Sequence, residues 1–359
     1  MTLPTIASVR VRAVDVPLDP PVETGSGIVA RAPLVVVDLA TSDGAQGRAY
    51  VFTYTPAALG PTAKLTENLS ALLIGKPLAP LDLNAGLQAR VRLLGNQGLV
   101  AMALAALDMA VWDAAARRAN LPLASHLGVS PAAIPAYASL RSMDLAKLVR
   151  ETEAAAKLGF KAAKLKTGRA DPLADRAAIE QTRAILGKTA TILIDYNQCL
   201  DERGAIARAR GLEDLDLGWI EEPLPATDFT GHARVAAAIR QPVQIGENWW
   251  GPEDAGKSLD ARASSYAMPD AMKIGGVTGW LKTSALCEAA GVRVSSHLFC
   301  EVSAHLLAAT PTRHYLEWLD LAAPILREPV KVIDGAVAPL PGPGIGLEWD
   351  EAALAKYLV

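Results

Sequence analysis

Eight short apolar segments recur over the last two thirds of the chain, and this repeat limits the possible folds more than any other feature of the sequence. In order, they are IPAYAS, AAKLKT, TILIDYN, GWIEEP, VQIGEN, AMPDAM, VRVSSH and HYLEWL. Helix-like segments, such as DRAAIEQTRAILG and FTGHARVAAAIR, separate most of them. Eight strands alternating with helices are typical of a (β/α)₈ barrel, because a doubly wound sheet usually has fewer strands and a glycine-rich first turn. We therefore predict an α/β fold with a (β/α)₈-type barrel.

The first third of the chain has a different pattern. ASVRVRAVDVPL alternates apolar and polar residues, APLVVVDLATSDG is an apolar strand closed by a turn, and AQGRAY is its expected hairpin partner. Helices are expected at about residues 61–74 and 83–118. We predict an α+β domain over residues 1–130, the barrel over 131–325, and a turn-rich C-terminal segment over 326–359 that returns to the first domain.

Composition and charge disfavour several classes of function. The 359 residues carry a formal net charge of −3 without a block of like charge, which argues against binding of nucleic acid or of a membrane surface. The cysteines Cys199, Cys287 and Cys300 have no paired spacing, so neither a disulfide framework nor a zinc cage is indicated. The longest apolar run, LVAMALAAL, is too short to span a bilayer, and MTLPTIASVRVRAVDVPL has no signal pattern. We expect a soluble, cytoplasmic protein.

Polar residues close seven of the eight predicted strands. From the second strand on, they are Lys166, Asp195, Glu221, Glu247, Asp270, His297 and Glu317. Neighbouring members are 20 to 29 residues apart, which is a plausible length for one strand and its helix. A single acidic residue at a strand end is most often a helix cap, but seven reactive residues in succession are hard to explain in this way. Because the carboxyl ends of barrel strands meet on the catalytic face, we expect these side chains to converge.

Three successive strand ends carry carboxylates, namely Asp195, Glu221 and Glu247. Three acids in a barrel mouth of low dielectric constant repel one another strongly unless a cation neutralises them. Oxygen ligands without an accompanying Cys or His suit Mg²⁺, with Mn²⁺ as an alternative and Zn²⁺ disfavoured. The competing interpretation is three separately paired surface acids, which the regular spacing disfavours.

Two kinds of base are expected across the barrel mouth from these acids. Lys164 and Lys166 are two residues apart on one strand, so their side chains point to the same face. We expect Lys164 to hold an anionic substrate and, with the metal, to lower the pKa of Lys166 until a neutral amine is available as a base. The alternative for the two lysines is a solvated edge strand. His297 is expected beside Asp270, and a neighbouring carboxylate fixes the tautomer of an imidazole. The remaining histidines are interpreted as structural: His126, His232, His305 and His314.

With these residues, the chain resembles the enolase superfamily and, within it, the mandelate racemase subgroup. The resemblance covers essentially the whole chain and rests on KLKTG, DYNQ, WIEEP, GEN, MPDAMKIGGVTGW, SSHLF and LEWLD. ALDMAVWD and the N-terminal α+β region are similar to the capping domain of this family. The resemblance implies a barrel whose N-terminal capping domain is completed by the C-terminal segment, and a homo-oligomer, commonly an octamer.

The same resemblance implies a mechanism of proton exchange on a small-molecule substrate. Mg²⁺ on the three acids would bind the carboxylate and the α-hydroxyl of a 2-hydroxy acid. Lys166 would exchange the α-proton on one face of the substrate, and His297, supported by Asp270, would exchange it on the other.

Four further residues have implied roles at the substrate oxygens. Glu317 would be a protonated electrophile that donates to the substrate carboxylate as it becomes an enediolate. Lys164 would neutralise the same carboxylate, and Asn197 and Ser139 would hold substrate oxygens.

The expected substrate pocket combines residues of the capping region with two residues beside the catalytic strand ends. Its predicted members are Val22, Ile28, Val29, Phe52, Tyr54, Leu298 and Leu319. An apolar, aromatic lining suits an aryl group and leaves the hydroxyls of a sugar acid unpaired, although ordinary core packing is the alternative for each residue. Glu23 and Ser26 are more polar than expected for a loop that closes over a phenyl ring, and Leu140 stands where the family pattern has a histidine.

We therefore expect Mg²⁺-dependent racemisation of mandelate or of a closely related aromatic 2-hydroxy acid. The alternative is an acid-sugar dehydratase of the same subgroup, which uses a similar set of Lys, His and Asp. A third hypothesis, from another class, is a catalytically silent relative that only binds its ligand.

Overall fold

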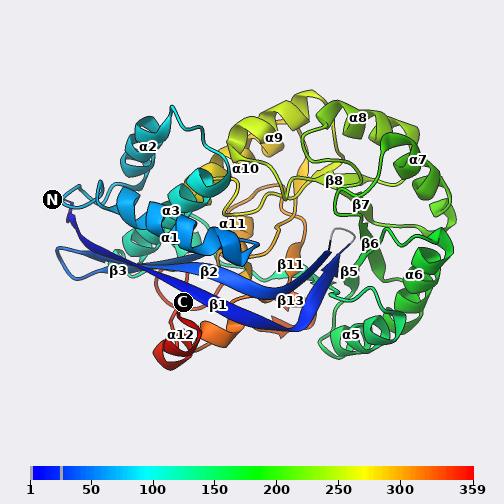
Figure 1. Cartoon of the computed structure of the whole chain (residues 1–359), viewed down its shortest axis with the longest axis horizontal. Coiled ribbons are helices and arrows are strands. Elements are labelled where there is room, and N and C mark those ends of the chain that lie inside the picture. The colour runs from blue at the N-terminus through cyan, green and yellow to red at the C-terminus, as the bar shows by residue number, and fades with distance from the viewer. Residues whose placement is uncertain (1–2, 25–26) are drawn as a thin grey trace.

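The computed structural model describes residues 3–24 and 27–359, and in it an N-terminal α+β part lies beside a ring of parallel strands (Figure 1). Ser26 lies outside the described residues. The N-terminal part holds an antiparallel sheet in the order β1-β2-β3, with helices packed against it. The bounds are β1 (Ile6–Thr24), β2 (Gly27–Thr41), β3 (Gln46–Phe52), α1 (Pro56–Ser70), α2 (Pro80–Val91), α3 (Gly98–Arg118) and α4 (Leu123–His126).

This sheet and α3 form the core of the N-terminal part. Apolar residues lie opposite one another across the strands, as in the pair of Val35 on β2 and Val51 on β3. Gly47 on β3 permits the close approach of α3, because a Cβ at this position would lie 2.0 Å from the carbonyl oxygen of Ala110. In the described chain, α3 is the one helix long and apolar enough to cross a membrane, but 78% of its most apolar window is buried, as in a core helix.

Two helix predictions were wrong in their bounds. The single helix expected over residues 83–118 is two helices, α2 and α3. The chain turns between them at Gly95, with φ of 81°, and α3 begins at Gly98, with φ of 55°. The first helix begins at Pro56 and not near residue 61. Pro56 suits the first helical turn, and the side chain of Thr55 accepts a hydrogen bond from the Ala57 N–H.

The second part is the predicted barrel. Seven of its eight strands fall within the predicted segments, and β9 begins one residue before the segment AMPDAM. Their bounds are β4 (Ile134–Ser139), β5 (Ala162–Lys166), β6 (Thr191–Asp195), β7 (Trp219–Glu221), β8 (Val243–Ile245), β9 (Tyr266–Ala267), β10 (Arg293–Val294) and β11 (Leu316–Trp318). Strands β4 to β10 are parallel neighbours in chain order, and β11 pairs with β4. The His314 N–H donates to the Val294 carbonyl at 2.7 Å, which joins the β11 side to β10 and completes the ring.

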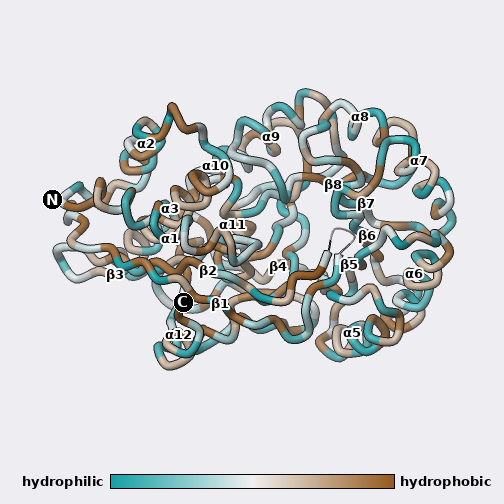
Figure 2. Tube along the Cα trace, in the orientation of Figure 1, coloured by the Kyte–Doolittle hydropathy of each residue, from teal (hydrophilic) through white to brown (hydrophobic). Residues whose placement is uncertain are grey.

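Helices cover the outside of this ring. They are α5 (Leu145–Lys157), α6 (Pro172–Leu186), α7 (Glu202–Arg210), η1 (Glu213–Leu215), α8 (Phe229–Ala238), α9 (Gly251–Asp260), α10 (Gly276–Ala289) and α11 (Cys300–Ala308). Figure 2 shows that α5 to α9 mix hydrophilic and hydrophobic stretches, as expected for helices with one face on the strands and one in water. α10 also packs on α3, where the Thr278 hydroxyl donates to Asp108 at 2.6 Å.

The C-terminal segment contacts both parts of the molecule. It follows η2 (Ala323–Ile325), and its elements are β12 (Val332–Ile333), β13 (Ala336–Val337) and α12 (Glu351–Tyr357). β13 pairs with β4 of the barrel in antiparallel direction. Beyond it, Gly344 accepts a hydrogen bond from the Leu123 N–H at 2.7 Å, and the Val359 N–H donates to Ala13 of β1 at 3.0 Å. These contacts link the N-terminal part to the barrel.

Candidate active site

Three carboxylates meet at the carboxyl ends of adjacent barrel strands. Asp195 and Glu221 are the last residues of β6 and β7 and pair in register, while Glu247 follows β8 by two residues. One oxygen of each lies within 4.8 Å of the others, and all three side chains are buried. Burial raises the pKa of Glu221 well above its ordinary value, and although Lys164 opposes this, the charges of Asp195 and Glu247 raise it further. A set of buried oxygen donors under this mutual repulsion fits a small, hard divalent cation such as Mg²⁺.

Lys164 and Lys166 lie against these carboxylates and are both buried, so the edge-strand alternative is wrong. β5, which carries them, is an interior strand between β4 and β6. The Nζ atom of Lys164 is 2.6 Å from Glu221 Oε1, and that of Lys166 is 2.6 Å from Asp195 Oδ2. Burial alone lowers the pKa of Lys164, but Glu221 and Glu317 raise it well above its ordinary value. Lys164 is therefore positively charged in this arrangement.

Glu317 lies between Lys164 and the loop that follows β10. Its Oε1 atom is 2.7 Å from Lys164 Nζ, and its Oε2 atom accepts a hydrogen bond from the Leu298 N–H at 2.9 Å. Burial raises the pKa of Glu317, but Lys164, His297 and Lys166 lower it to about 2, so the carboxylate is ionised in this arrangement. The protonated state that the family resemblance implies is thus not the state that the contact with Lys164 favours.

His297 and Asp270 form a hydrogen-bonded pair on the other side of the site. The backbone at Asp270 forms a bridge with that at His297, which brings the two side chains together with Nδ1 and Oδ2 2.7 Å apart. The N–H groups of Met272 and Lys273 donate to Asp270 Oδ1. Because a carboxylate held by these donors accepts from Nδ1–H, Nε2 is the basic atom, and it lies 3.2 Å from Glu247 Oε2. Burial lowers the pKa of His297, but Glu247 and Asp270 raise it above its ordinary value.

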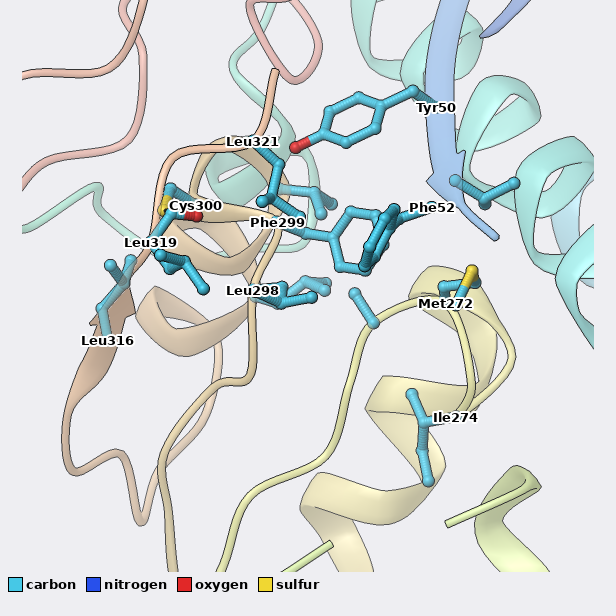
Figure 3. Packing of buried hydrophobic residues seen from close by; sticks show 14 of the residues in the cluster. Tyr50, Phe52, Met272, Ile274, Leu298, Phe299, Cys300, Leu316, Leu319 and Leu321 are labelled. Atoms are coloured by element: carbon cyan, nitrogen blue, oxygen red, sulfur yellow. The ribbon is translucent and has the colours of Figure 1, made fainter. Parts of the chain in front are cut away.

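Of these groups, Lys166, Glu247 and His297 line a cavity of about 310 Å³, whose lining residues divide into an apolar and a polar set, called here the apolar and the polar wall. The apolar wall consists of Leu18, Val22, Val29, Phe52, Tyr54, Leu298, Leu319 and Leu321. The polar wall consists of Thr24, Lys166, Asn197, Gln198, Glu247, Asn248, Lys273 and His297. Figure 3 shows how Phe52 from β3 points toward Leu298 and Phe299 of the barrel, with Leu319 and Leu321 beyond them. The cavity therefore lies between the N-terminal part and the barrel mouth.

Most of the predicted pocket residues line this cavity, but Ile28 and Ser139 do not. Ile28 is 71% exposed, because successive residues of a strand point to opposite faces and its neighbour Val29 lines the cavity. Ser139 lines a neighbouring cavity of about 270 Å³, which shares Leu319 with the first. Its Oγ is buried and has no hydrogen-bond partner among the described residues. Asn197 lies on the polar wall, and its backbone N–H donates to Asp195 at 2.7 Å.

Two contributions to this site were missed in the sequence. The hydroxyl of Tyr54, predicted only to line the pocket, donates to Asp270 Oδ2 at 3.3 Å. Lys273 and its partner Asn248 line the polar wall although neither closes a strand. Lys273 lies inside the motif MPDAMKIGGVTGW, three residues after Asp270, and this short spacing was the feature that could have identified it.

The position of Glu23 explains why a polar residue occurs in the loop beside the pocket. Its side chain contacts the barrel and does not line the cavity. Glu23 Oε2 accepts from the Met143 N–H at 2.7 Å, and Oε1 lies 3.1 Å from Lys147 Nζ. The Glu23 N–H also donates to the Arg141 carbonyl at 2.7 Å. These contacts anchor the end of β1, which carries the cavity residue Val22, to the loop that precedes α5.

We expect Glu23→Ala to raise KM for the substrate by about tenfold while kcat changes by less than about twofold, because the anchor positions a wall of the cavity and not the reacting groups. Steady-state kinetics measure both constants. The matched control is Glu153→Ala, an exposed acid on α5. A loss confined to kcat would contradict the anchoring role.

Comparison with known proteins agrees with this fold and acid cluster. Residues 147–353 match the family model for the enolase C-terminal domain-like fold, and residues 6–128 match the N-terminal domain of mandelate racemase / muconate lactonizing enzyme. The chain belongs to this enolase-superfamily family. The predicted fold class is thereby confirmed.

Relatives in this family have several activities. The chain is 31% identical to 3,6-anhydro-alpha-L-galactonate cycloisomerase of Streptomyces coelicolor over 91% of each chain. It is 28% identical to L-talarate/galactarate dehydratase of Salmonella typhimurium over 89% of this chain and 81% of the relative. The crystal structure of an enolase from Bradyrhizobium, complexed with magnesium and mandelic acid, matches with a TM-score of 0.96 and 45% identity and covers 100% of this chain and 99% of that one. This protein is thus a Mg²⁺-dependent enzyme of the enolase superfamily, as the donor set of the site also indicates.

Proposed function

We propose that this protein racemises mandelate or a closely related aromatic 2-hydroxy acid. The observation that carries the proposal is that two different bases, Lys166 and His297, line one cavity together with Glu247 of the acid cluster and with the residues of the apolar wall. The Bradyrhizobium relative, crystallised with mandelic acid, supports the same substrate class. We assign Asp195, Glu221 and Glu247 as the ligands of Mg²⁺.

In the proposed mechanism, each base serves one face of the α-carbon. Lys166 Nζ takes the α-proton from one enantiomer, and His297 Nε2 takes it from the other. The opposite group, in its protonated form, then returns a proton to the second face of a planar enediolate. Asp270 keeps the imidazole in the tautomer whose Nε2 is free to accept. Bound Mg²⁺ supplies positive charge against the negative charge that develops on the substrate oxygens.

Lys164 and Glu317 act together on the substrate carboxylate in this proposal. The ammonium of Lys164 attracts that carboxylate, which competes with Glu317 for the same cation. Once Lys164 turns to the substrate, Glu317 loses the first of the charges that lower its pKa, and burial then favours its protonated form. A protonated Glu317 donates a hydrogen bond to the developing enediolate.

Dehydration of an acid sugar is the second candidate, and the polar wall of the cavity favours it. Asn248, Gln198 and Lys273 lie where they could meet sugar hydroxyls, and the Salmonella relative is a dehydratase. The apolar wall counts against this candidate, because it would leave buried hydroxyls without partners. Octameric assembly and a cytoplasmic location stay predictions.

A substrate panel separates the two candidates. We expect polarimetry to show loss of rotation for (R)- and (S)-mandelate with Mg²⁺, while galactarate and talarate give no 2-keto-3-deoxy acid in a semicarbazide assay. Production of the keto acid with unchanged mandelate rotation would replace the racemase proposal by the dehydratase. If neither product forms and no α-proton exchanges, a ligand-binding role is the better interpretation.

A further inference from the structure

Lys273 is a buried ammonium group in the cavity wall that the proposed mechanism leaves without a role. Only 5% of the residue is exposed, and it lies in the loop between β9 and α10. Its Nζ atom contacts the amide oxygen of Asn248 at 2.6 Å and lies 4.3 Å from the ring centroid of Tyr54. Burying an ammonium group costs free energy unless its surroundings compensate for the lost hydration. The contacts with Asn248 and Tyr54 provide this compensation, so both are expected to matter to the site.

The contact with Asn248 helps to determine which end of this amide faces the acid cluster. An ammonium has only donors, so it can bind only the amide oxygen. The amide nitrogen is thereby directed to the carboxylates, where Nδ2 donates to Glu247 Oε1 at 3.1 Å and to Glu222 Oε2 at 2.8 Å. The two carboxylates favour the same orientation, because an ionised carboxylate only accepts, and Lys273 holds the amide from its oxygen side. Lys273 thus orients a proposed metal ligand through one intervening residue.

The contact with Tyr54 reaches the other half of the site. A cation over an aromatic face is attracted by the electrons of the ring. Tyr54 has φ of 59°, a left-handed conformation that is unfavourable for a bulky residue and requires support from its surroundings. The ring also packs on Phe52 with centroids 4.5 Å apart, and its hydroxyl donates to Asp270. Lys273 therefore helps to hold Tyr54, which contacts Asp270 of the Asp270–His297 pair.

We propose that Lys273 is a positioning residue that orients Glu247 through Asn248 and supports the Asp270–His297 pair through Tyr54. The part of this inference that is tested by proton exchange rests on the proposed function. The part that is tested by Mg²⁺ binding does not, since the orientation of Glu247 affects that binding whatever the substrate is. Lys273 makes no contact with the reacting atoms in this assignment. Its positive charge and its position, and not its bulk, are what the site requires.

Calorimetric titration of Mg²⁺ into the purified variants tests the proposal without a substrate. We expect Lys273→Met, which has similar bulk and no charge, to bind Mg²⁺ about tenfold more weakly. Lys273→Arg keeps the charge and the donor and is expected to recover affinity to within about threefold of the unaltered protein. The control is Lys282→Met, an exposed lysine on α10 that should bind as the unaltered protein does. Equal affinity of Lys273→Met and the unaltered protein, or equal loss in Lys273→Arg, would overturn the proposal.

Asn248→Leu removes the amide that connects Lys273 to Glu247, and it provides the test if Lys273→Met does not fold. It should weaken Mg²⁺ binding to the same extent, and the double variant should be no weaker than either single variant. Independent, additive losses would overturn the route through Asn248. If the unaltered protein fails to exchange the α-proton of mandelate, the proposed function fails, while the titrations still decide the role of Lys273.

Where exchange is measurable, the Tyr54 arm gives a second result. Lys273→Met should lower exchange at the His297 face more than exchange at the Lys166 face. The reason is that Tyr54 donates to Asp270, the partner of His297, whereas the partner of Lys166 is Asp195. Loss of the same size at both faces, with unchanged Mg²⁺ affinity, would contradict the positioning role.

Discussion

In the His297→Asn enzyme, exchange of the α-proton from one enantiomer of mandelate is expected to fall by about 10³-fold or more, while exchange from the other enantiomer continues in D₂O. The reason is geometric. His297 Nε2 is the basic atom of a pair fixed by Asp270, and Lys166 lies on a different strand against Asp195. Asparagine keeps a side-chain donor near Asp270 but has no basic nitrogen. Proton NMR of each enantiomer measures the two rates separately.

Lys166→Arg is the matched variant for this experiment. It keeps a cation beside Asp195, but a guanidinium does not lose its proton near neutral pH and cannot serve as a base. The expected result is the mirror image, with loss of exchange from the second enantiomer and retention from the first. If each variant lost both exchanges to the same extent, the assignment of one base to each face would be wrong.

Glu221→Gln should instead abolish exchange from both enantiomers and weaken Mg²⁺ binding by about 100-fold. This change removes a charged ligand from a buried acid cluster whose oxygens lie within 4.8 Å of one another, and an amide oxygen is a weaker ligand for a hard dication. It also removes the carboxylate that lies 2.6 Å from Lys164. Calorimetric titration gives the affinity, and the NMR assay gives the two exchange rates.

Glu213→Gln is the control for this substitution, since Glu213 is an exposed acid on η1 outside the site. It should leave both affinity and exchange unchanged. Full Mg²⁺ affinity in Glu221→Gln would remove Glu221 from the proposed ligand set. The contrast between a symmetric loss here and one-sided losses at His297 and Lys166 separates the roles of the metal site and of the bases.

The barrel was predictable because each strand and the residue that closes it are encoded locally. Asp195 and Glu221 each end a short apolar run, and parallel strands in chain order must bring such residues to one edge. The same logic placed His297 beside Asp270. Neither inference required knowledge of a contact between distant segments, because the closure of the ring supplies all of these contacts at once.

The rest of the site depends on side-chain contacts that no local pattern specifies. Tyr54 reaches Asp270 across 216 positions of the chain, and Glu23 reaches Lys147 across 124. The ionised state of Glu317 follows from its distance to Lys164, which only the folded barrel defines. Such contacts between the N-terminal part and the barrel arise after the two parts pack together. Sequence periodicity indicates the helices and strands within each part, but it does not indicate which side chains meet between the two parts.

The most direct test of the racemase proposal is proton NMR of (R)- and (S)-mandelate in D₂O with the unaltered protein and Mg²⁺, together with optical rotation of the same samples. We predict loss of the α-proton signal from both enantiomers and decay of rotation to zero from either side, with both effects removed by EDTA. Retention of the α-proton in both enantiomers at full Mg²⁺ occupancy would contradict the racemase proposal.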